Sequence, residues 1–569
     1  MDYIIDLENF GFKYKSQAEA NLKNINLKVK KGEKILIAGP SGSGKSTLAK
    51  AINGQIPNTF SGSMLGKIIV NGKRVDQASI FDLSLAVGTV LQDTDGQFVG
   101  LSVGEDIAFS LENDNVSREK MLDEVRAWAE RLNILNLLDK KPRDLSGGQK
   151  QVVAIAGVLV SDVPILLLDE PLASLDPRAG RDVMKLVKGL CEDLGYTLLV
   201  IEHRLEEALL LEPDRIILMD EGEIIFDSEP KDLLRTDLLR KVGIRNPLYL
   251  DALAYGGVDL EKFPDLSSLD KLSLARVDLE KIERRVGQIK PTKRSVSKEV
   301  ILDVKNISFS YEGRKVLDNI SFNLKKGELV SVVGPNGAGK STLAKLLCGF
   351  LRPDEGEIWL GDIESKTLSI KEIAEKIGFV LQNPNSMLSK TMIYDEVALG
   401  LRLRGEDEKV IRKKVEEVLD ICGLRAYKSW PISALSYGQR RRVSIAAILV
   451  LDPELIILDE PTAGQDFYHY SQMMEFIENL RDTLQISILM ISHDMHLIQE
   501  YTERSLVVVD GKILRDTSPA ELFSDKTLLE KAHLAETSLY KLGERLPQTS
   551  AKDFIEKFIA YERGQRIEK

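Results

Sequence analysis

The sequence has few cysteines and no long apolar run. Its 569 residues include three cysteines, Cys191, Cys348 and Cys422, and their wide spacing excludes a disulfide framework and the paired-cysteine pattern of a metal site. We therefore expect a reducing, cytosolic setting. The longest uninterrupted apolar run, Ile445–Leu451, is much shorter than a stretch that crosses a bilayer. The first predicted element is a strand, Tyr3–Leu7, so no secretory signal is expected.

An excess of basic residues is also absent. Lys and Arg number 77 against 88 Asp and Glu, which gives a net charge of −11. Sequence-independent binding to nucleic acid requires clustered Lys and Arg, so no nucleic-acid partner is expected. A hydrophobic content of 43% and a charged content of 29% are typical of a soluble globular protein, and the length predicts two to four domains.

A phosphate-binding loop is the most informative motif. Gly39–Thr47 fits the pattern G-x-x-x-x-G-K-[ST] and lies between a predicted strand, Lys34–Ala38, and a helix that starts near Lys45. The backbone N–H groups of such a loop converge on one concavity, and the helix N-terminus adds partial positive charge. In this motif the lysine reaches the β- and γ-phosphates, and the next hydroxyl, here that of Ser46, ligates Mg²⁺.

The same motif occurs a second time, behind another apolar strand, Leu329–Val333. Two occurrences in one chain indicate two nucleotide sites. The residues predicted to hold phosphates are Gly39, Ser41, Gly42, Gly44, Lys45, Ser46 and Thr47 in the first loop, and Gly334, Asn336, Gly337, Gly339, Lys340, Ser341 and Thr342 in the second.

The whole chain repeats one pattern twice. Lys45 and Lys340 are 295 residues apart, whereas the later motif positions repeat at a spacing of 290. A longer loop in the first copy, Asn58–Gly66, explains the difference. A repeat of this length indicates duplicated domains, and the alternation of apolar strands with helical stretches predicts an α/β core with parallel strands.

Polar side chains follow three predicted strands of each copy. A glutamine can ligate Mg²⁺ or water through its amide oxygen. An Asp-Glu pair lies at the carboxyl end of a strand, where α/β sheets bind ligands; the Asp is expected to hold Mg²⁺ through water, and the Glu to orient or deprotonate the attacking water. A histidine can hydrogen-bond to a γ-phosphate oxygen or to that water. These residues are Gln92, Asp169, Glu170 and His203, and Gln382, Asp459, Glu460 and His493.

Each copy has a second predicted anion site. Leu145–Lys150 and Leu435–Arg440 place small residues at the start of a helix, where free N–H groups attract an anion. Since each copy already has its own phosphate loop, this site is best explained as serving another nucleotide. Upstream, Tyr14 and Tyr311 precede the loops by about 30 residues, and each either stacks on an adenine or packs into the sheet.

In this order, the phosphate loop, glutamine, Leu-Ser-x-Gly-Gln, Asp-Glu and histidine resemble the nucleotide-binding domains of ABC ATPases over both copies. The resemblance implies two tandem α/β domains, each with an antiparallel β subdomain and a helical subdomain, that hydrolyse ATP with Mg²⁺. It also implies a head-to-tail pairing in which the Leu-Ser-x-Gly-Gln signature of one copy closes the site of the other, here within one chain.

The resemblance then assigns each side chain to one of the two sites. The implied signature contacts are Ser436, Gly438 and Gln439 for the site with Lys45, and Ser146, Gly147, Gly148 and Gln149 for the site with Lys340. The implied Mg²⁺ ligands are Ser46, Gln92 and Asp169 in the first site, and Ser341, Gln382 and Asp459 in the second.

The second copy departs from the family pattern at two places. Tyr437 stands where a glycine is usual, and its side chain is expected to crowd the γ-phosphate and slow the site that contains Lys45. Ser174–Asp176 resembles the D-loop of the family, whereas the second copy has Ala463–Asp466. Because both glutamates and both histidines are kept, we expect two hydrolytic sites with different rates.

Within the family, Gln92–Phe109 closely resembles the ATPases of energy-coupling factor (ECF) transporters, which take up cobalt and vitamins; Asn383–Leu399 is a looser match. The resemblance implies a groove for the coupling helices of a transmembrane subunit, a separate substrate-binding membrane subunit, and a peripheral position on the cytoplasmic face of the membrane. Acidic side chains here are either ordinary solvated acids or partners for basic residues of that subunit. They are Asp95, Glu105, Asp106, Asp395 and Glu396.

The expected domains are residues 1–229 and 299–518, each a nucleotide-binding domain, with a helical extension and linker over 230–298 and a C-terminal helical extension over 519–569. The connector, residues 226–300, has 15 Lys and Arg against 13 Asp and Glu, and Lys290–Lys298 is its expected flexible joint. The alternative function is a soluble twin ATPase that acts on ribosomes or nucleic acid. A basic helical linker is typical of that class, and the near-neutral connector argues against it.

Overall fold

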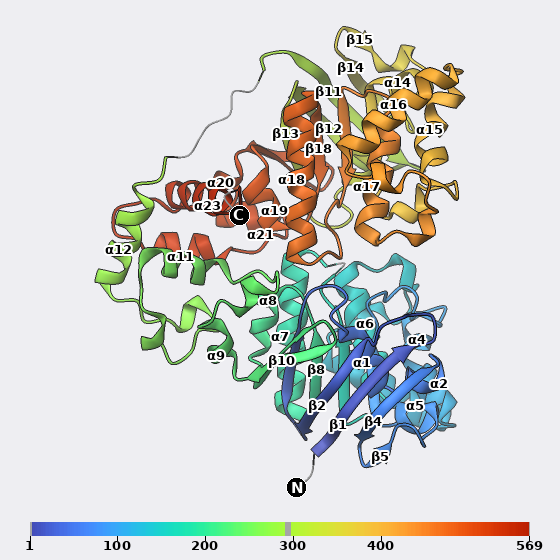
Figure 1. The fold of residues 1–569 in the computed structure, drawn as a ribbon, viewed down its shortest axis with the longest axis vertical. Helices are drawn as coiled ribbons and strands as arrows, with labels where there is room; N and C mark the ends of the chain where they lie inside the picture. Colours follow the sequence, from blue (N-terminus) through green and yellow to red (C-terminus); the bar gives the residue numbers. More distant parts are fainter. Residues whose placement is uncertain (1–2, 174, 291–296, 568–569) are drawn as a thin grey trace. The chain divides into compact units, whose positions relative to one another are not determined.

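The computed structural model describes residues 3–173, 175–290 and 297–567 (Figure 1). The chain forms two compact units, one of Met1–Ile282 with Gly464–Tyr468 and one of Glu283–Ala463 with His469–Lys569. Each unit has a six-stranded sheet, parallel except at one edge, and an antiparallel four-stranded sheet. The expected fold class is therefore confirmed, whereas the boundaries at residues 229, 298 and 518 stay predictions. Ser174, in the predicted D-loop, and 291–296, in the predicted joint, lie outside the described residues.

The six-stranded sheet of the first unit carries predicted site residues at its strand ends. Its order is β10-β9-β3-β8-β7-β6, with β10 antiparallel and the other strands parallel. Both faces of such a sheet are covered, so its strands are continuously apolar, as in Ile165–Leu168, where every side chain is buried. The bounds are β3 (Lys34–Ala38), β6 (Val87–Val90), β7 (Ile165–Asp169), β8 (Thr197–Ile201), β9 (Arg215–Asp220) and β10 (Glu223–Ser228).

The antiparallel sheet has the order β2-β1-β4-β5. Phe10 and Phe12 are buried, and Tyr14 at the end of the strand is partly buried against the same core, as the alternation predicts. One apolar core joins this sheet, α1 and the parallel sheet. The bounds are β1 (Tyr3–Tyr14), β2 (Leu22–Lys30), β4 (Gly62–Val70), β5 (Lys73–Arg74) and α1 (Lys45–Ile52).

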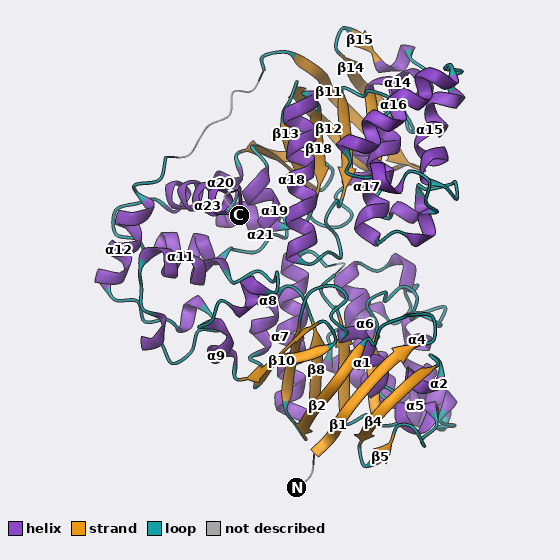
Figure 2. Cartoon of the chain, viewed as in Figure 1, coloured by secondary structure: helices purple, strands orange, loops and turns teal. Residues whose placement is uncertain are grey.

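The remaining helices up to Val286 include a helical subdomain, formed by α4, α5 and α6, and four helices that follow β10, of which α12 runs past Ile282 into the second unit (Figure 2). In the subdomain α4 packs against α5 and α6. The bounds are α2 (Gln55–Asn58), α3 (Ile80–Ser84), α4 (Val103–Asn113), α5 (Arg118–Arg131), α6 (Gly147–Leu159), α7 (Pro177–Leu194) and α8 (Leu205–Ala208), followed in the connector by α9 (Pro230–Leu234), α10 (Leu238–Lys241), α11 (Leu248–Gly256) and α12 (Arg276–Val286).

The second unit repeats both sheets in the same order, β12-β11-β14-β15 and β20-β19-β13-β18-β17-β16. The strand bounds are β11 (Val300–Tyr311), β12 (Arg314–Lys325), β13 (Leu329–Val333), β14 (Glu355–Leu360), β15 (Ile363–Glu364), β16 (Ile377–Val380), β17 (Leu455–Asp459), β18 (Ser487–Ile491), β19 (Arg504–Val509) and β20 (Lys512–Thr517). The helix bounds are α13 (Lys340–Leu347), α14 (Ile370–Lys376), α15 (Ile393–Leu403), α16 (Glu408–Ile421), α17 (Tyr437–Leu449), α18 (Phe467–Leu484) and α19 (Met495–Tyr501).

Within the described residues, the C-terminal extension is helical, as expected, and contains four helices. Leu522 and Phe523 pack in one cluster with Val333 of β13 and Val507 of β19, so the extension is docked on the parallel sheet of the second unit. The bounds are α20 (Pro519–Leu522), α21 (Lys526–Lys531), α22 (Ser538–Glu544) and α23 (Ala551–Ile567).

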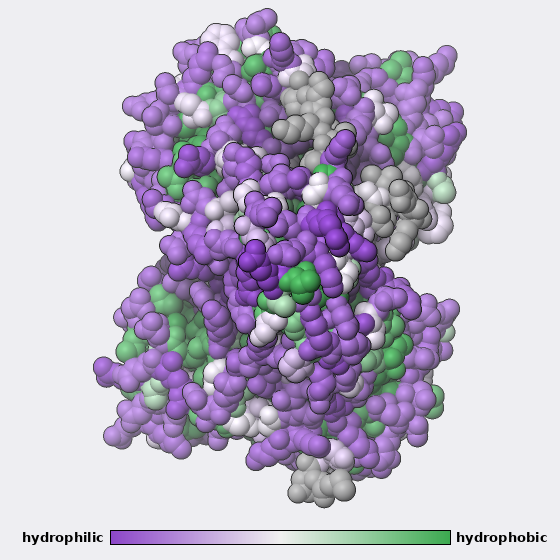
Figure 3. Space-filling view, turned by 90° about the vertical axis from the view of Figure 1, so that its left-hand side faces the viewer, coloured by the Kyte–Doolittle hydropathy of each residue, from purple (hydrophilic) through white to green (hydrophobic). Residues whose placement is uncertain are grey.

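The surface shown in Figure 3 is mainly hydrophilic, with hydrophobic residues in separate areas. Among the residues that the structure describes, no helix combines the length and the apolar content needed to cross a membrane.

A glycine brings α6 directly against the sheet. A Cβ atom on Gly88, in β6, would lie 2.2 Å from Cγ1 of Val158, in α6, and 2.8 Å from Cγ2 of Val163. The second copy repeats the arrangement, since a Cβ atom on Gly378 would lie 2.1 Å from Cγ2 of Ile448, in α17. These glycines therefore set how closely the helices that begin at the predicted second anion sites approach the sheets.

We predict that Gly88→Ala lowers the free energy of unfolding of the first unit by about 1–3 kcal/mol, because the added methyl group overpacks this contact. Urea unfolding followed by circular dichroism measures the change. The matched control is Gly189→Ala in α7, where a Cβ atom meets nothing within 4 Å and the substitution is expected to stabilise by about 0.5–1 kcal/mol. Equal stability of the Gly88→Ala and unaltered chains would contradict the close approach.

Candidate functional site

The first phosphate loop is held in shape by its own lysine. Lys45 Nζ donates to the carbonyl oxygens of Gly39 and Pro40, both at 2.8 Å, and lies 3.4 Å from Ser43 Oγ. A Cβ atom on Gly39 would come within 2.3 Å of Met219 O, so only glycine fits there. Burial lowers the pKa of Lys45 to about 8, opposed by the nearby carboxylates, of which Glu170 is the strongest. The loop thus presents a cation at the start of α1, as the motif predicts.

The second loop has the same geometry. Lys340 Nζ donates to Gly334 O at 2.8 Å and to Pro335 O at 2.9 Å. A Cβ atom on Gly334 would lie 1.9 Å from Val508 O. Gly42 and Gly44 of the first loop, like Gly337 and Gly339 of the second, adopt positive φ angles between 83° and 102°, a region that glycine enters without strain.

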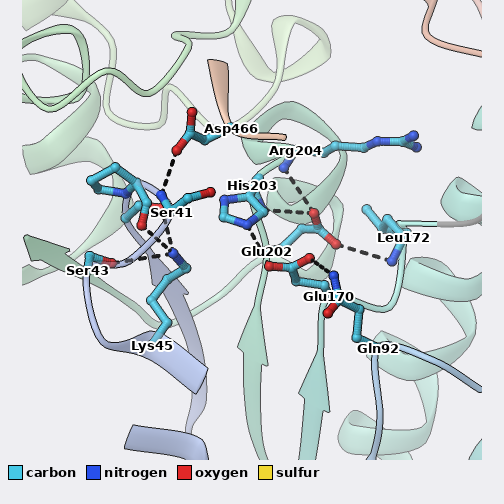
Figure 4. Close-up of polar contacts among 12 residues, drawn as sticks. Ser41, Ser43, Lys45, Gln92, Glu170, Leu172, Glu202, His203, Arg204 and Asp466 are labelled. Atoms are coloured by element: carbon cyan, nitrogen blue, oxygen red, sulfur yellow. Dashed lines mark hydrogen bonds and ion pairs between the residues drawn. The ribbon is translucent and has the colours of Figure 1, made fainter. Parts of the chain in front are cut away.

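At the strand ends of the first unit, Glu170 lies between Gln92 and His203 (Figure 4). His203 Nε2 is 2.6 Å from Glu170 Oε1, and Gln92 Nε2 donates to Glu170 Oε2 at 2.5 Å. Glu170 has a φ of 50°, an unfavourable value for this residue type that is characteristic of functional sites. The three predicted catalytic side chains of the first copy therefore meet.

Burial and neighbouring charges shift the pKa values of two side chains in this cluster, Asp169 and His203. Burial raises the pKa of Asp169 to about 6, and the negative charge of Glu170 acts in the same direction. Burial alone would lower the pKa of His203. The hydrogen bond to Glu170 and the negative charge of Glu170 outweigh the effect of burial, so the pKa of His203 is raised. The contact with Glu170 therefore favours the protonated form of the His203 imidazole.

Glu202 is a functional candidate that the sequence analysis passed over. Its carboxylate is 3% exposed and accepts hydrogen bonds from the backbone N–H groups of Leu172 (3.2 Å), His203 (2.8 Å) and Arg204 (3.1 Å). Burial raises its pKa. Glu202 thereby ties the segment after Glu170 to the segment that carries His203. Its presence beside His203 was visible in the sequence, but its buried position was not.

The second copy arranges the same residues more loosely. His493 Nε2 is 3.4 Å from Glu460 Oε1, and Glu460 has a φ of 46°. Ser492 replaces Glu202, and its hydroxyl donates to Glu460 Oε2 at 3.4 Å. Burial raises the pKa of Asp459, and the charges of Lys340 and Arg441 oppose the shift.

The predicted Mg²⁺ ligands supply the right donors. Hydroxyl, amide and carboxylate oxygens are the ligands that Mg²⁺ accepts, together with waters and substrate phosphates. Asp169 Oδ1 is buried and has no hydrogen-bond partner, which leaves it available. Within the described residues no cluster of three or more His, Cys, Asp and Glu could hold a metal. The set Ser46, Gln92 and Asp169 therefore fits an ion that is also held by a nucleotide.

Each signature motif caps a helix. The Ser146 and Ser436 hydroxyls accept bonds from the N–H groups of Gln149 and Gln439, whose amide oxygens bond back to the serine N–H groups. Within the described residues, no hydrogen bond joins a signature to the phosphate loop of the same copy. The assignment of Ser146, Gly147, Gly148 and Gln149, and of Ser436, Gly438 and Gln439, to the other nucleotide stays a prediction.

Tyr437 faces its own copy. Its hydroxyl donates to Gln382 O at 3.3 Å, and its ring lies under the guanidinium of Arg441. The expected crowding of a γ-phosphate stays a prediction. Tyr14 makes edge contacts with Phe12 and Phe60, and Tyr311 is 42% exposed, so adenine stacking also stays a prediction.

Gly464–Tyr468, which overlaps the second-copy segment that departs from the D-loop pattern, belongs to the first compact unit. Asp466 Oδ2 accepts a hydrogen bond from Ser41 N at 2.6 Å (Figure 4). In the first copy, Asp176 caps α7 by accepting from Ala179 N at 2.9 Å.

The acidic residues expected to meet a membrane subunit have partners within the chain. Asp95 pairs with Lys150, and Asp395 pairs with Arg402. The other carboxylates accept backbone N–H bonds: Asp106 from Val99 and Gly100, Glu105 from Leu101 and Ser102, and Glu396 from Ser389 and Lys390. Their role in binding a partner stays a prediction, and these internal bonds reduce the need for one.

The fold and site define a phosphate-loop nucleotide hydrolase with two copies of the site. Comparison with protein families is consistent with this class: the ABC transporter family matches residues 22–173 and 317–463, and the chain belongs to that family. A second family, described as an ATP-binding cassette cobalt transporter, matches residues 236–309. The chain is thus an ATP-binding subunit of an ABC transporter, and an ATPase.

Several relatives match nearly the whole chain. A protein of Enterococcus faecalis is 52% identical over 99% of both chains, and one of Clostridium perfringens is 50% identical over 99% of both. Both are provisionally named as ABC transporter ATP-binding proteins. The solved structure of cbiO1 from Clostridium perfringens, described as part of the ABC transporter complex cbiONQ, is 32% identical with a TM-score of 0.39, covering 44% of this chain and 97% of that one.

We predict that Glu202→Gln lowers the free energy of unfolding of the first unit by about 1–3 kcal/mol, because an amide cannot accept all three buried N–H bonds. It should also lower the turnover number (kcat), since His203 and the segment after Glu170 lose their common anchor. Urea unfolding and an ATPase assay measure the two effects. The control, Glu192→Gln on the surface, should change stability by less than about 0.5 kcal/mol; an equally small effect of Glu202→Gln would refute the anchor.

Proposed function

We propose that the chain is the ATP-hydrolysing subunit of an ECF-type importer for a micronutrient, either a vitamin or a transition-metal ion. The observation that carries the proposal is the match to the cobalt-transporter family of residues 236–309, which cover most of the connector and most of β11, in a chain whose two phosphate loops are both intact. Separate membrane subunits would bind the substrate and span the membrane, with this chain at their cytoplasmic face.

Hydrolysis at each site follows from the residues at the strand ends. The loop N–H groups and Lys45 hold the β- and γ-phosphates, and Mg²⁺, when bound through Ser46, Gln92 and Asp169, neutralises charge on the phosphates. Glu170 is proposed to orient or deprotonate the attacking water, because its carboxylate lies at the carboxyl end of β7, at the sheet edge where the loop with Lys45 also lies (Figure 4). His203 then holds Glu170 and donates to the γ-phosphate. Lys340, Glu460 and His493 act in the same way.

The two sites are proposed to be composite. A capped helix start with free N–H groups suits a phosphate, and neither signature bonds to the loop of its own copy. Ser436, Gly438 and Gln439 would then close the site with Lys45, and Ser146, Gly147, Gly148 and Gln149 the site with Lys340. Binding of ATP would draw the copies together and move the membrane subunit, and hydrolysis would release them.

The proposed membrane partner meets the segment before α4. Leu101 is 82% exposed and Val99 is 62% exposed, beside acidic residues whose charges are already satisfied. An apolar helix surface is therefore the better match for this segment than a basic one. The alternative of a ribosomal or nucleic-acid function has no observation in its favour.

The assigned bases are tested by Glu170→Gln together with Glu460→Gln. We expect the double variant to lose ATP turnover while ATP stabilises its closed state, because binding groups are kept and the bases are removed. Each single variant is expected to keep part of the turnover. Phosphate release and nucleotide retention on the same samples give the two readouts. Undiminished phosphate release from the double variant would refute these roles.

The transport role is tested by affinity purification of the tagged chain from native membranes. We expect small hydrophobic membrane subunits to copurify, and Leu101→Asp to abolish their recovery because it places a charge in the apolar contact. The matched control is Leu65→Asp, at another exposed leucine (73% exposed), which should retain them. Recovery of ribosomes in place of membrane subunits would contradict the proposal.

A further inference from the structure

A buried arginine in the second copy joins the signature helix to two catalytic segments. Arg441, in the second turn of α17, is 1% exposed. Its Nη1 donates to Glu460 O at 2.8 Å, and its Nη2 donates to Gln382 O. Tyr437 Oη donates to the same Gln382 oxygen, and the Arg441 guanidinium carbon lies 5.6 Å from the centre of the Tyr437 ring. One side chain therefore holds the backbone of both Gln382 and Glu460.

The first copy lacks this connection. Gln151 occupies the position of Arg441; it is 2% exposed, and its Nε2 has no hydrogen-bond partner. Gly147, at the position of Tyr437, has no side chain. Another link is kept in both copies, since Lys150 Nζ donates to Asp95 at 2.5 Å and the equivalent Arg440 donates to Asn385 at 2.9 Å. Among these positions, the two copies thus differ at Gln151 against Arg441 and at Gly147 against Tyr437, and keep the link made by Lys150 and Arg440.

The charge of Arg441 is not needed for packing. Burying a guanidinium is costly unless its hydrogen bonds and charge are compensated. Burial lowers the pKa of Arg441, and Tyr437 and the carboxylates of Glu460 and Asp459 oppose the shift. A neutral glutamine is buried at the equivalent position of the first copy, so a cation is not required there for the helix to pack, and the cost of burying one in the second copy calls for a further role.

We infer that Arg441 is a positioning residue that fixes Gln382 and Glu460 relative to the start of α17, and that it does so in the second copy alone. The inference rests on the roles proposed above for Gln382 and Glu460. The start of α17 also carries Ser436, which is proposed to contact the other nucleotide. A movement of α17 caused by that nucleotide is therefore transmitted to Glu460 through Arg441. In the described part of the first copy, Gln151 makes no equivalent connection between α6 and Glu170 through its Nε2.

The test is Arg441→Gln, which installs the residue that the first copy already accommodates. In the otherwise unaltered full-length chain we expect kcat to fall at least about twofold. In a Glu170→Gln chain, where the remaining turnover comes from the site with Glu460, we expect it to fall about tenfold, because the rate is sensitive to small displacements of catalytic groups. The Michaelis constant (KM) for ATP should stay unchanged, since Arg441 touches neither phosphate loop, and the melting temperature should fall only slightly, since the first copy accommodates a buried glutamine at this position. The matched control, Gln151→Ala, should change kcat less than about twofold, and Tyr437→Phe should have a smaller effect than Arg441→Gln.

Three outcomes would overturn the inference. The first is an unchanged kcat in Arg441→Gln. The second is a fall in kcat accompanied by a proportional rise in KM and loss of melting temperature, which indicates a merely structural role. The third is an unchanged kcat in Glu460→Gln, which removes the proposed role of Glu460 as well. If Glu460→Gln lowers kcat and Arg441→Gln does not, the inference on Arg441 fails and the proposed role of Glu460 stands.

Discussion

The structure depends on the parallel pairing of neighbouring strands, which brings their carboxyl ends to one edge of each sheet. The pairing continues one residue past the strand, since Glu170 N donates to Ile201 O and Glu460 N donates to Ile491 O, both at 2.9 Å. These bonds hold each glutamate beside the segment that carries the histidine. Each glutamate adopts a left-handed backbone conformation there, so the ladder that builds the sheet also supports a strained residue at its end. Parallel strand pairing is therefore what brings together the phosphate loop, the glutamine, the Asp-Glu pair and the histidine.

The motifs were predictable from the sequence because each one depends on spacing along the chain. A glycine pattern between a strand and a helix, or a carboxylate at a strand end, needs no knowledge of tertiary contacts. Glu202 and Arg441 could not be found in this way, since their importance comes from burial and from partners distant in sequence. Asp106 and Glu396 show the converse: an acidic side chain that looks available for a partner in the sequence already accepts hydrogen bonds from backbone N–H groups nearby.

The two copies share one frame and differ in how they support it. In the first copy a buried carboxylate, Glu202, anchors the histidine segment, and the glutamate–histidine contact is 2.6 Å. In the second copy Ser492 takes that place, the contact is 3.4 Å, and Arg441 holds the glutamate from the helix side. A duplicated domain can therefore keep all its nucleotide-binding residues while the supporting contacts diverge, which provides a physical basis for two sites of unequal rate.

The central claim is that each ATP is held between a phosphate loop of one copy and the signature of the other, within one chain. The most direct measurement is disulfide formation between cysteines introduced at Ser146 and Asn336, because the three native cysteines are buried and unreactive. The account predicts a disulfide within a single chain that forms with Mg-ATP, is absent without nucleotide, and is unaffected by dilution. No disulfide in the ATP-bound protein, or one that forms only between two chains, would contradict it.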